Sequence, residues 1–172
     1  MGQVEAIFVA EADGAPMVAR DGVEAVAGGL AGDRYLTGRG YYTPFDVCEV
    51  TFVEREAIDE IRELYDIDLS DGRHRRNLVT EGVDVHEDLL ESRFRIGDAV
   101  FEGTRRRPPC AHVEDVAEEE GVMRALKDGR GGICAEVMAE GDLEVGDEVE
   151  VLESTAFDGV GLASAIRDRV GR

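Results

Sequence analysis

Two stretches of this chain repeat one pattern, in which alternating apolar and polar residues lead into a Gly-Asp pair and continue after it. They are residues 94–101 and 143–151. Alternation with a period of two is typical of a half-buried strand, and glycine supplies the backbone freedom that a tight turn requires. Both stretches therefore predict a strand, a tight turn and a second strand, and such recurrent arches favour a barrel.

The rest of the chain contributes more strands and few helices. Residues 3–10 and 23–27 have the composition of strands. Residues 54–65 form the clearest helix, because apolar residues recur there at spacings of three and four. Residues 113–127 predict a helix interrupted at Gly121. The expected fold is mostly β with a few helices (α+β), a distorted closed barrel.

The domain organisation follows from length and composition. A chain of 172 residues with 43% hydrophobic residues is long enough to bury one proper core. We expect one domain over residues 1–152 and a tail over residues 153–172 with a short amphipathic helix. No stretch approaches the length of a membrane span, and the first ten residues are too acidic for a secretory signal. These observations predict a soluble, cytoplasmic protein.

The charge balance limits the kinds of molecule that this chain is expected to bind. The formal net charge is -20, and Lys127 is the only lysine beside 39 acidic residues. Nucleic acid and anionic membranes repel such a chain, so neither is an expected partner. The composition resembles that of proteins from extreme halophiles, in which arginine replaces lysine. Most carboxylates are accordingly interpreted as groups that keep the surface hydrated.

Cys110 is the strongest candidate for chemistry. It follows three arginines, residues 105–107, and two prolines, Pro108 and Pro109. Nearby cations lower the pKa of a thiol from about 8.5 and favour the reactive thiolate, while the prolines stiffen the segment. His112, two residues on, could tune the thiol or carry a proton. The alternative is a small buried cysteine behind a solvated charge run.

The other two cysteines give a weaker signal. Cys48 and Cys134 both lie in runs with strand composition, where a packing role is the simpler interpretation. Neither a C-x-x-C pair nor classical zinc spacing occurs in the sequence. Three reduced thiols are therefore expected, and not a disulfide framework.

A second group of residues points to an anionic ligand. Residues 73–79 place three arginines and an asparagine directly before an apolar strand, Arg34 lies in the glycine-rich loop of residues 28–35, and residues 105–107 add three more arginines. Guanidinium groups bind phosphate and carboxylate with two parallel hydrogen bonds. The glycine-rich loop lacks the spacing of a nucleotide-binding motif. The set suggests a phosphate-bearing ligand, and the alternative is that these arginines pair with surrounding carboxylates.

These residues together resemble a known family, the MOSC domain, which is named for the C-terminal part of molybdenum cofactor sulfurases. The resemblance runs from about residue 4 to residue 151. It is most specific in residues 29–34 (GLAGDR), 75–77 (RRN), 94–98 (FRIGD), 109–110 (PC) and 146–149 (GDEV). The resemblance implies a mostly β fold and a cysteine that binds molybdenum or carries sulfur.

The resemblance also implies roles for single residues. The essential cysteine of the family corresponds to Cys110, as the metal ligand and catalytic residue. The element that helps to hold the pterin cofactor in amidoxime-reducing members corresponds to Arg75 and Asn77, with Arg76 between them.

The glycine-rich loop has a counterpart in the family too, and it is implied to line the same cavity. Its matching residues are Gly29, Gly32, Asp33 and Arg34. Two positions depart from the family pattern: Tyr35 stands where histidine is frequent, and Cys134 where relatives often have arginine. Both departures bear on the substrate.

Two classes of function are consistent with this resemblance, and both need a partner. One is a molybdenum enzyme that reduces N-hydroxylated small molecules with electrons from a separate donor protein. The other is a carrier whose Cys110 persulfide receives sulfur from a separate cysteine desulfurase. A domain that holds the cofactor without turnover is a third alternative. Intrinsic pyridoxal phosphate chemistry is not expected, because Lys127 lies next to a glycine-rich turn.

Overall fold

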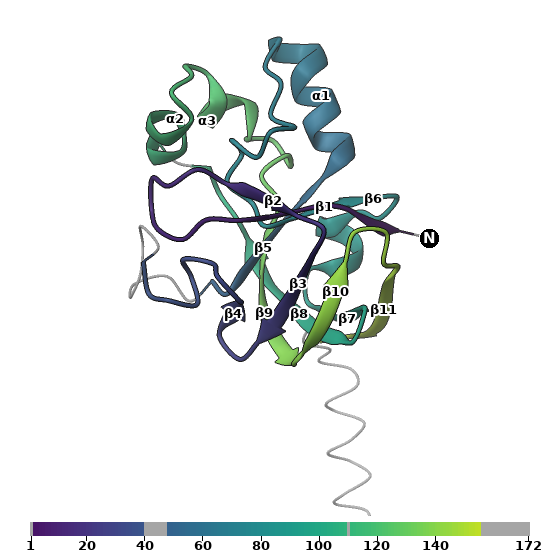
Figure 1. The fold of residues 1–172 in the computed structure, drawn as a ribbon. Coiled ribbons are helices and arrows are strands. Elements are labelled where there is room, and N and C mark those ends of the chain that lie inside the picture. The colour runs from purple at the N-terminus through teal and green to yellow at the C-terminus, as the bar shows by residue number, and fades with distance from the viewer. Residues whose placement is uncertain (1, 40–47, 110, 156–172) are drawn as a thin grey trace, which may run out of the picture.

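The computed structural model describes residues 2–39, 48–109 and 111–155, and it consists mostly of strands (Figure 1). The strands are β1 (Gln3–Val9), β2 (Val18–Arg20), β3 (Gly22–Val26), β4 (Gly29–Leu30), β5 (Val50–Glu54), β6 (Leu78–Glu81), β7 (Ser92–Ile96), β8 (Ala99–Arg106), β9 (Ile133–Ala139), β10 (Gly141–Glu144) and β11 (Val149–Ser154). The helices are α1 (Arg55–Tyr65), α2 (Ala111–Ala117), α3 (Val122–Ala125) and a π-helix, η1 (Val85–Leu89). The expected helix of the tail falls in residues 156–172, outside the described residues.

The large sheet has eight strands in the order β11-β7-β8-β9-β5-β6-β1-β2, and a three-stranded sheet has the order β10-β3-β4. The large sheet curls until β1 reaches the turn before β11. A β-bridge joins Gln3 to Glu148, and the Val4 amide donates to the Asp147 carbonyl at 2.9 Å. The expected mostly β fold around a distorted barrel is therefore confirmed.

The two predicted strand arches have different topologies. In the first, β7 and β8 pair as an antiparallel hairpin across Gly97, whose φ of 59° is the left-handed conformation that favours glycine. In the second, β10 and β11 are not paired with each other. β10 pairs with β3 in the small sheet, whereas β11 pairs with β7 in the large one. The second arch thus connects the two sheets.

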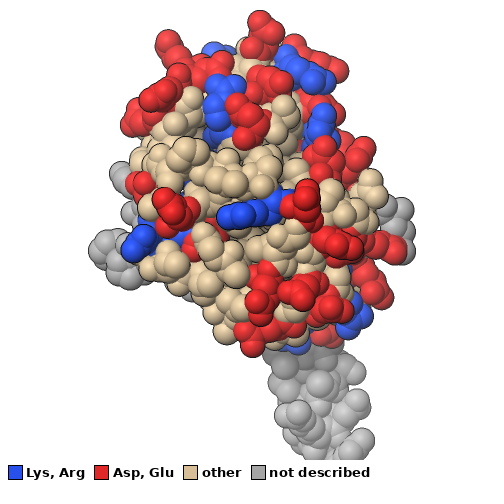
Figure 2. Space-filling view, in the orientation of Figure 1, with Lys and Arg blue, Asp and Glu red and all other residues tan. Residues whose placement is uncertain are grey.

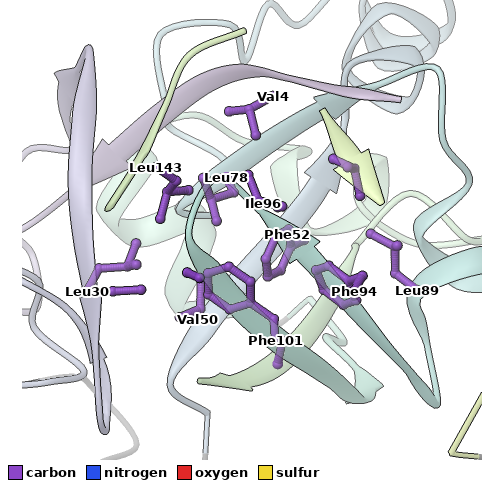
Figure 3. Close-up of a cluster of buried hydrophobic side chains, with 14 of the residues drawn as sticks. Val4, Leu30, Val50, Phe52, Leu78, Leu89, Phe94, Ile96, Phe101 and Leu143 are labelled. Atoms are coloured by element: carbon purple, nitrogen blue, oxygen red, sulfur yellow. The ribbon is translucent and has the colours of Figure 1, made fainter. Parts of the chain in front are cut away.

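Three phenylalanines fill the inside of the barrel (Figure 3). Phe52 from β5 meets Phe94 and Phe101 edge to face, with ring centroids 5.3 and 5.6 Å apart. The next residue, Val53, is also buried and belongs to a second apolar cluster with Ile61 of α1. Both faces of β5 are therefore covered, which explains why this strand is a continuous apolar run.

Helices α1, α2 and α3 gather at one end of the barrel (Figure 1). Helix α1 begins one residue later than predicted and buries Ile58 and Ile61 as its spacing indicates. The predicted interruption at Gly121 separates α2 from α3, because Gly121 has a φ of 96°. The Glu114 carboxylate accepts hydrogen bonds from the Gly121 and Met123 amides at 3.1 and 3.0 Å and stabilises this break.

Carboxylates are spread over the surface, and the face shown in Figure 2 carries far more of them than basic groups. In the parts of the chain that the structure describes, no helix has the length and apolar character needed to cross a bilayer.

Candidate functional site

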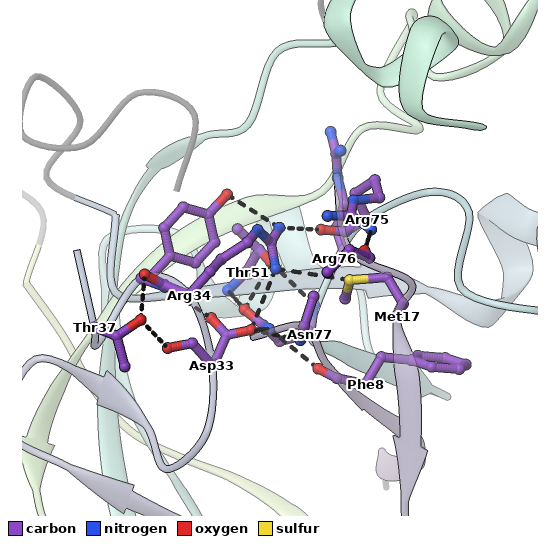
Figure 4. A network of polar contacts seen from close by, with 12 residues as sticks. Phe8, Met17, Asp33, Arg34, Thr37, Thr51, Arg75, Arg76 and Asn77 are labelled. Atoms are coloured by element: carbon purple, nitrogen blue, oxygen red, sulfur yellow. Dashed lines mark hydrogen bonds and ion pairs between the residues drawn. The ribbon is translucent and has the colours of Figure 1, made fainter. Parts of the chain in front are cut away.

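Asn77 is the centre of a buried polar network at the end of the barrel near the helices (Figure 4). Its side-chain oxygen accepts hydrogen bonds from the amide and the hydroxyl of Thr51, both at 3.0 Å. Its side-chain nitrogen donates to the Phe8 carbonyl and to the Asp33 carboxylate, both at 3.1 Å. All four hydrogen-bonding positions of this amide are used, so Asn77 joins β1, β5 and the glycine-rich loop to β6.

Asp33 is fully buried and fixes the glycine-rich loop. Its carboxylate accepts from the Ala10 amide at 3.1 Å and from the Tyr35 amide at 3.2 Å, besides Asn77. Gly32 precedes it with a φ of 82°, and nothing lies within 4 Å of the position of an added Cβ. Gly32 therefore supplies a backbone conformation, while Asp33 anchors the loop.

Arg34 extends from this anchored loop toward the arginine-rich segment that precedes β6. Its guanidinium donates to the Asp33 carboxylate at 3.2 Å and to the Arg75 carbonyl at 3.1 Å. It also lies 4.5 Å from the centre of the Tyr35 ring. These contacts hold two distant segments of the chain together.

The arginines of these segments surround one small cavity of about 40 Å³. It is lined by Asp13, Arg34, Tyr35, Arg75, Arg76, Arg107, Pro108, His112, Val113 and Val116. Four of these side chains are guanidinium groups and one is a carboxylate. We call this space the arginine cavity.

The arginine cavity is strongly electropositive. Burial lowers the pKa of Arg75 to about 10, with a further contribution from Arg34. The pKa of Arg76 also falls to about 10, through burial and the nearby Arg107. Burial raises the pKa of the Tyr35 hydroxyl, against the opposing effect of Arg34 and Arg107, so it stays a neutral phenol. An anion in this cavity would relieve the repulsion between the arginines.

Arg75 has the features of a ligand-binding side chain. Its backbone is in the left-handed region with a φ of 68°, which is strained for a residue other than glycine. One terminal nitrogen donates to the Ala15 carbonyl. The other, Nη2, is buried and has no hydrogen-bond partner within the described residues. A buried cationic donor without a partner is costly, and an anion would satisfy it.

Arg76 mainly holds the backbone together. Its guanidinium donates to the Gly131 carbonyl at 2.9 Å and to the His74 carbonyl at 2.7 Å, and its side chain is almost fully buried. His74 is buried as well, and its Nδ1 accepts from the Arg76 amide at 2.9 Å. Burial lowers the pKa of His74 to about 3, so this imidazole is neutral.

Cys110 itself lies outside the described residues, but its neighbours in sequence do not. Pro108 and His112 both line the arginine cavity. Of the three arginines before the prolines, only Arg107 reaches it, where Nη2 donates to the Tyr35 hydroxyl at 3.0 Å. Of the three consecutive arginines, Arg107 therefore lines the cavity, whereas Arg105 and Arg106 are exposed.

The structure places the other predicted site residues in two groups. Arg34, Arg75 and Arg76 line the arginine cavity. Gly32, Asp33 and Asn77 do not line it and instead hold the glycine-rich loop that carries Arg34. Cys48 and Cys134 are both buried, as a packing role requires. Arg107, from the third basic group of the sequence, and Tyr35, from the glycine-rich loop, line the cavity too, whereas Asp13 also lines it and was assigned no place there from the sequence. For Asp13 no motif in the sequence signals this position.

A comparison with models of protein families matches residues 45–150 to the MOSC domain, more than half of the chain. The chain belongs to the MOSC domain family. This family is associated with binding of the molybdenum cofactor. No curated protein matches the chain.

Solved structures agree with this assignment at the level of the fold. The YuaD protein from Bacillus subtilis is 19% identical with a TM-score of 0.74, over 89% of this chain and 97% of that one. YiiM from Geobacillus stearothermophilus is 16% identical with a TM-score of 0.68, over 89% of this chain and 76% of that one. YiiM from Escherichia coli is 19% identical with a TM-score of 0.66, over 95% and 76%. The present MOSC domain shares their fold.

A separate cluster of titratable groups joins β5 to η1. Ligand atoms of Glu54, Asp84 and His86 lie within 4.8 Å of one another, and no other such set of three occurs in the described residues. The Glu54 carboxylate accepts from the Val85 amide at 2.8 Å. Burial raises the pKa of Glu54 to about 7, with further contributions from Asp84 and Glu56.

This raised pKa predicts a pH dependence of stability. The folded state keeps the Glu54 proton between pH 4.5 and about 7, where the unfolded chain loses it, so stability falls as the pH rises through this window. We expect Glu54→Gln to raise the free energy of unfolding by about 2 kcal/mol at pH 8 and to leave it unchanged at pH 4. Urea unfolding at both pH values measures this. The control is Glu63→Gln on exposed helix surface, and equal effects of the two variants would contradict the prediction.

Proposed function

We propose that this MOSC domain binds the molybdenum cofactor through Cys110 and the arginine cavity, and reduces N-hydroxylated compounds with electrons from a separate donor protein. One observation carries the proposal. Four arginines line one cavity together with Pro108 and His112, which flank Cys110 in sequence, and the buried Nη2 atom of Arg75 has no partner among the described residues.

The residues present fit an anionic cofactor. Guanidinium groups match the oxygens of a phosphate, and a cysteine thiolate is a soft ligand suited to a metal such as molybdenum. A cavity of about 40 Å³ suits a group of the size of one oxyanion. Arg75 and Arg34 would therefore hold the anionic end of the cofactor, and Cys110 its metal.

The chemistry divides between the cofactor and the chain. When bound, the cofactor supplies a metal centre that exchanges two electrons with the substrate. The net reaction breaks the N–O bond, consumes two electrons and two protons, and yields the amine and water. The chain binds the anionic group, orients it through the Asp33 and Asn77 network, and keeps positive charge beside the reacting centre.

The sulfur carrier is the second candidate, and the small volume of the arginine cavity favours it. The positive charge around Pro108 and His112 would stabilise a persulfide anion on Cys110, and such an anion needs little space. The sulfur would come from a separate cysteine desulfurase. A domain that holds the cofactor without turnover is the third alternative.

One purification separates these candidates. The protein is isolated in high KCl from a host that makes the cofactor, and the molybdenum content and the reduction of an N-hydroxylated base with an artificial donor are measured. Stoichiometric molybdenum with turnover, both lost in Cys110→Ala, supports the enzyme. Cyanide-labile sulfur on Cys110 without molybdenum supports the carrier, and molybdenum without turnover supports the binding domain.

Arg75→Ala tests the arginine cavity itself. Loss of a buried guanidinium that would contact the anion is expected to reduce molybdenum occupancy by about tenfold. Arg95→Ala is the matched control, because Arg95 is exposed on β7 and pairs with Glu150 at the surface. Unchanged occupancy in Arg75→Ala would contradict the proposed role of the cavity.

A further inference from the structure

The loop between β1 and β2, called the strap below, borders the arginine cavity through Asp13. It is held at three points: the Asp13 amide donates to the Arg39 carbonyl at 2.9 Å, the Ala15 carbonyl accepts from Arg75, and the Asp13 carboxylate meets His112 Nε2 at 2.6 Å. Two of these contacts are made with residues that line the cavity. The strap therefore borders the cavity on the side of α2.

The strap brings a negative charge to the arginines. Asp13 is the one acidic side chain that the structure places in the lining of the arginine cavity. Its charge acts on Arg75, since it raises the pKa of that guanidinium while burial and Arg34 lower it. About a third of the Asp13 side chain is exposed, so the carboxylate can leave without opening the barrel.

We propose that the Asp13 carboxylate is a resident counter-ion that competes with an anionic ligand for the arginine cavity, and so determines which anions are bound there. This inference rests on the proposed function, because it requires that the cavity take the anionic group of a ligand. His112 is the present partner of the Asp13 carboxylate and keeps it at the edge of the cavity.

Competition of this kind gives selectivity. An incoming anion meets the negative charge of Asp13 in the cavity lining, and its attraction to the arginines has to exceed its repulsion by that carboxylate. A doubly charged oxyanion such as phosphate meets this condition better than a singly charged one such as formate. Asp13 is therefore a specificity-determining residue for the proposed ligand, and no part in the chemistry is assigned to it.

The test uses inorganic phosphate and formate as probes of the full chain. Dissociation constants are measured by calorimetry at constant ionic strength for the unmodified protein, Asp13→Asn and Glu11→Gln. Asp13→Asn removes the competing charge and keeps the shape, so we expect phosphate to bind about five to ten times more tightly and formate to become detectable. Glu11→Gln changes the net charge equally in the same loop without lining the cavity, and is expected to bind as the unmodified protein does.

Each other outcome has a definite meaning. If Asp13→Asn and the unmodified protein bind phosphate equally and Arg75→Ala abolishes binding, the cavity takes anions and the competition proposal is wrong. If Asp13→Asn and Glu11→Gln tighten binding equally, the effect is one of net charge, which also overturns it. If neither the unmodified protein nor any variant binds phosphate, the competition proposal is also wrong. The proposed function is tested separately by the molybdenum content. Circular dichroism confirms that each variant is folded.

Discussion

Gly132→Ala is expected to destabilise the protein strongly. A Cβ at this position would lie 1.8 Å from the Phe52 carbonyl oxygen, and the backbone φ of 82° is strained for any other residue. The obstacle is the backbone of β5, a strand buried on both faces, which cannot move aside as a flexible side chain can. We expect a loss of at least about 4 kcal/mol, a large part of the stability of a typical domain.

Gly129→Ala is the matched control for this prediction. Gly129 has nearly the same φ, 81°, but nothing lies within 4 Å of an added Cβ. Its substitution should lower the free energy of unfolding by about 1 kcal/mol, because only the left-handed backbone conformation disfavours alanine there. Urea unfolding followed by circular dichroism measures both variants. A similar loss in the two would mean that backbone conformation, and not the close approach to β5, governs Gly132.

Asn77→Ala is the second large expected effect, with a loss of about 3 to 4 kcal/mol in the free energy of unfolding. The substitution removes four hydrogen bonds at a fully buried site. It leaves the Phe8 carbonyl and the Thr51 amide without this partner, and it deprives the buried Asp33 carboxylate of a donor. Because Asp33 anchors Arg34, the arginine cavity should also lose its shape and bind anions more weakly.

Thr80→Val on the same strand separates this effect from a general sensitivity of β6. The Thr80 hydroxyl is buried and has no partner in the described structure, so valine removes an unsatisfied polar group of similar volume. We expect Thr80→Val to be neutral or slightly stabilising. Thermal and urea unfolding test both variants. If Asn77→Ala proved as stable as Thr80→Val, the hydrogen bonds of Asn77 would not contribute the stability that we assign to them.

Much of the fold could be predicted because its signals are local. The stripe of Ile58 and Ile61 marks α1, and Gly121 marks the break between α2 and α3. Strand pairing was less predictable. The two Gly-Asp arches look alike in sequence, yet one is a hairpin and the other connects two sheets. Whether the two strands of an arch pair with each other depends on which distant strands pair with their edges. No residue within the arch indicates those partners.

The candidate site was predictable in its chemistry and less so in its division of roles. The arginines were identified, and four of them, Arg34, Arg75, Arg76 and Arg107, meet at one cavity. Asn77 was assigned to the cofactor by resemblance, and in the structure its amide makes four hydrogen bonds, with Thr51, Phe8 and Asp33. Hydrogen-bond partners of a buried amide are set by the packing of three strands, so its sequence neighbours could not reveal them.

The sequence by itself determined the elements of this MOSC domain, the excess of negative charge, and the presence of arginine clusters in an acidic chain, since all of these depend on residues close together in the chain. Only the tertiary structure decided which charges meet. Asp33 and Asn77 are 44 residues apart, and Asp13 and His112 are 99 apart. Such contacts form when the barrel closes and its loops converge at one end, because the core dictates where each loop begins and ends.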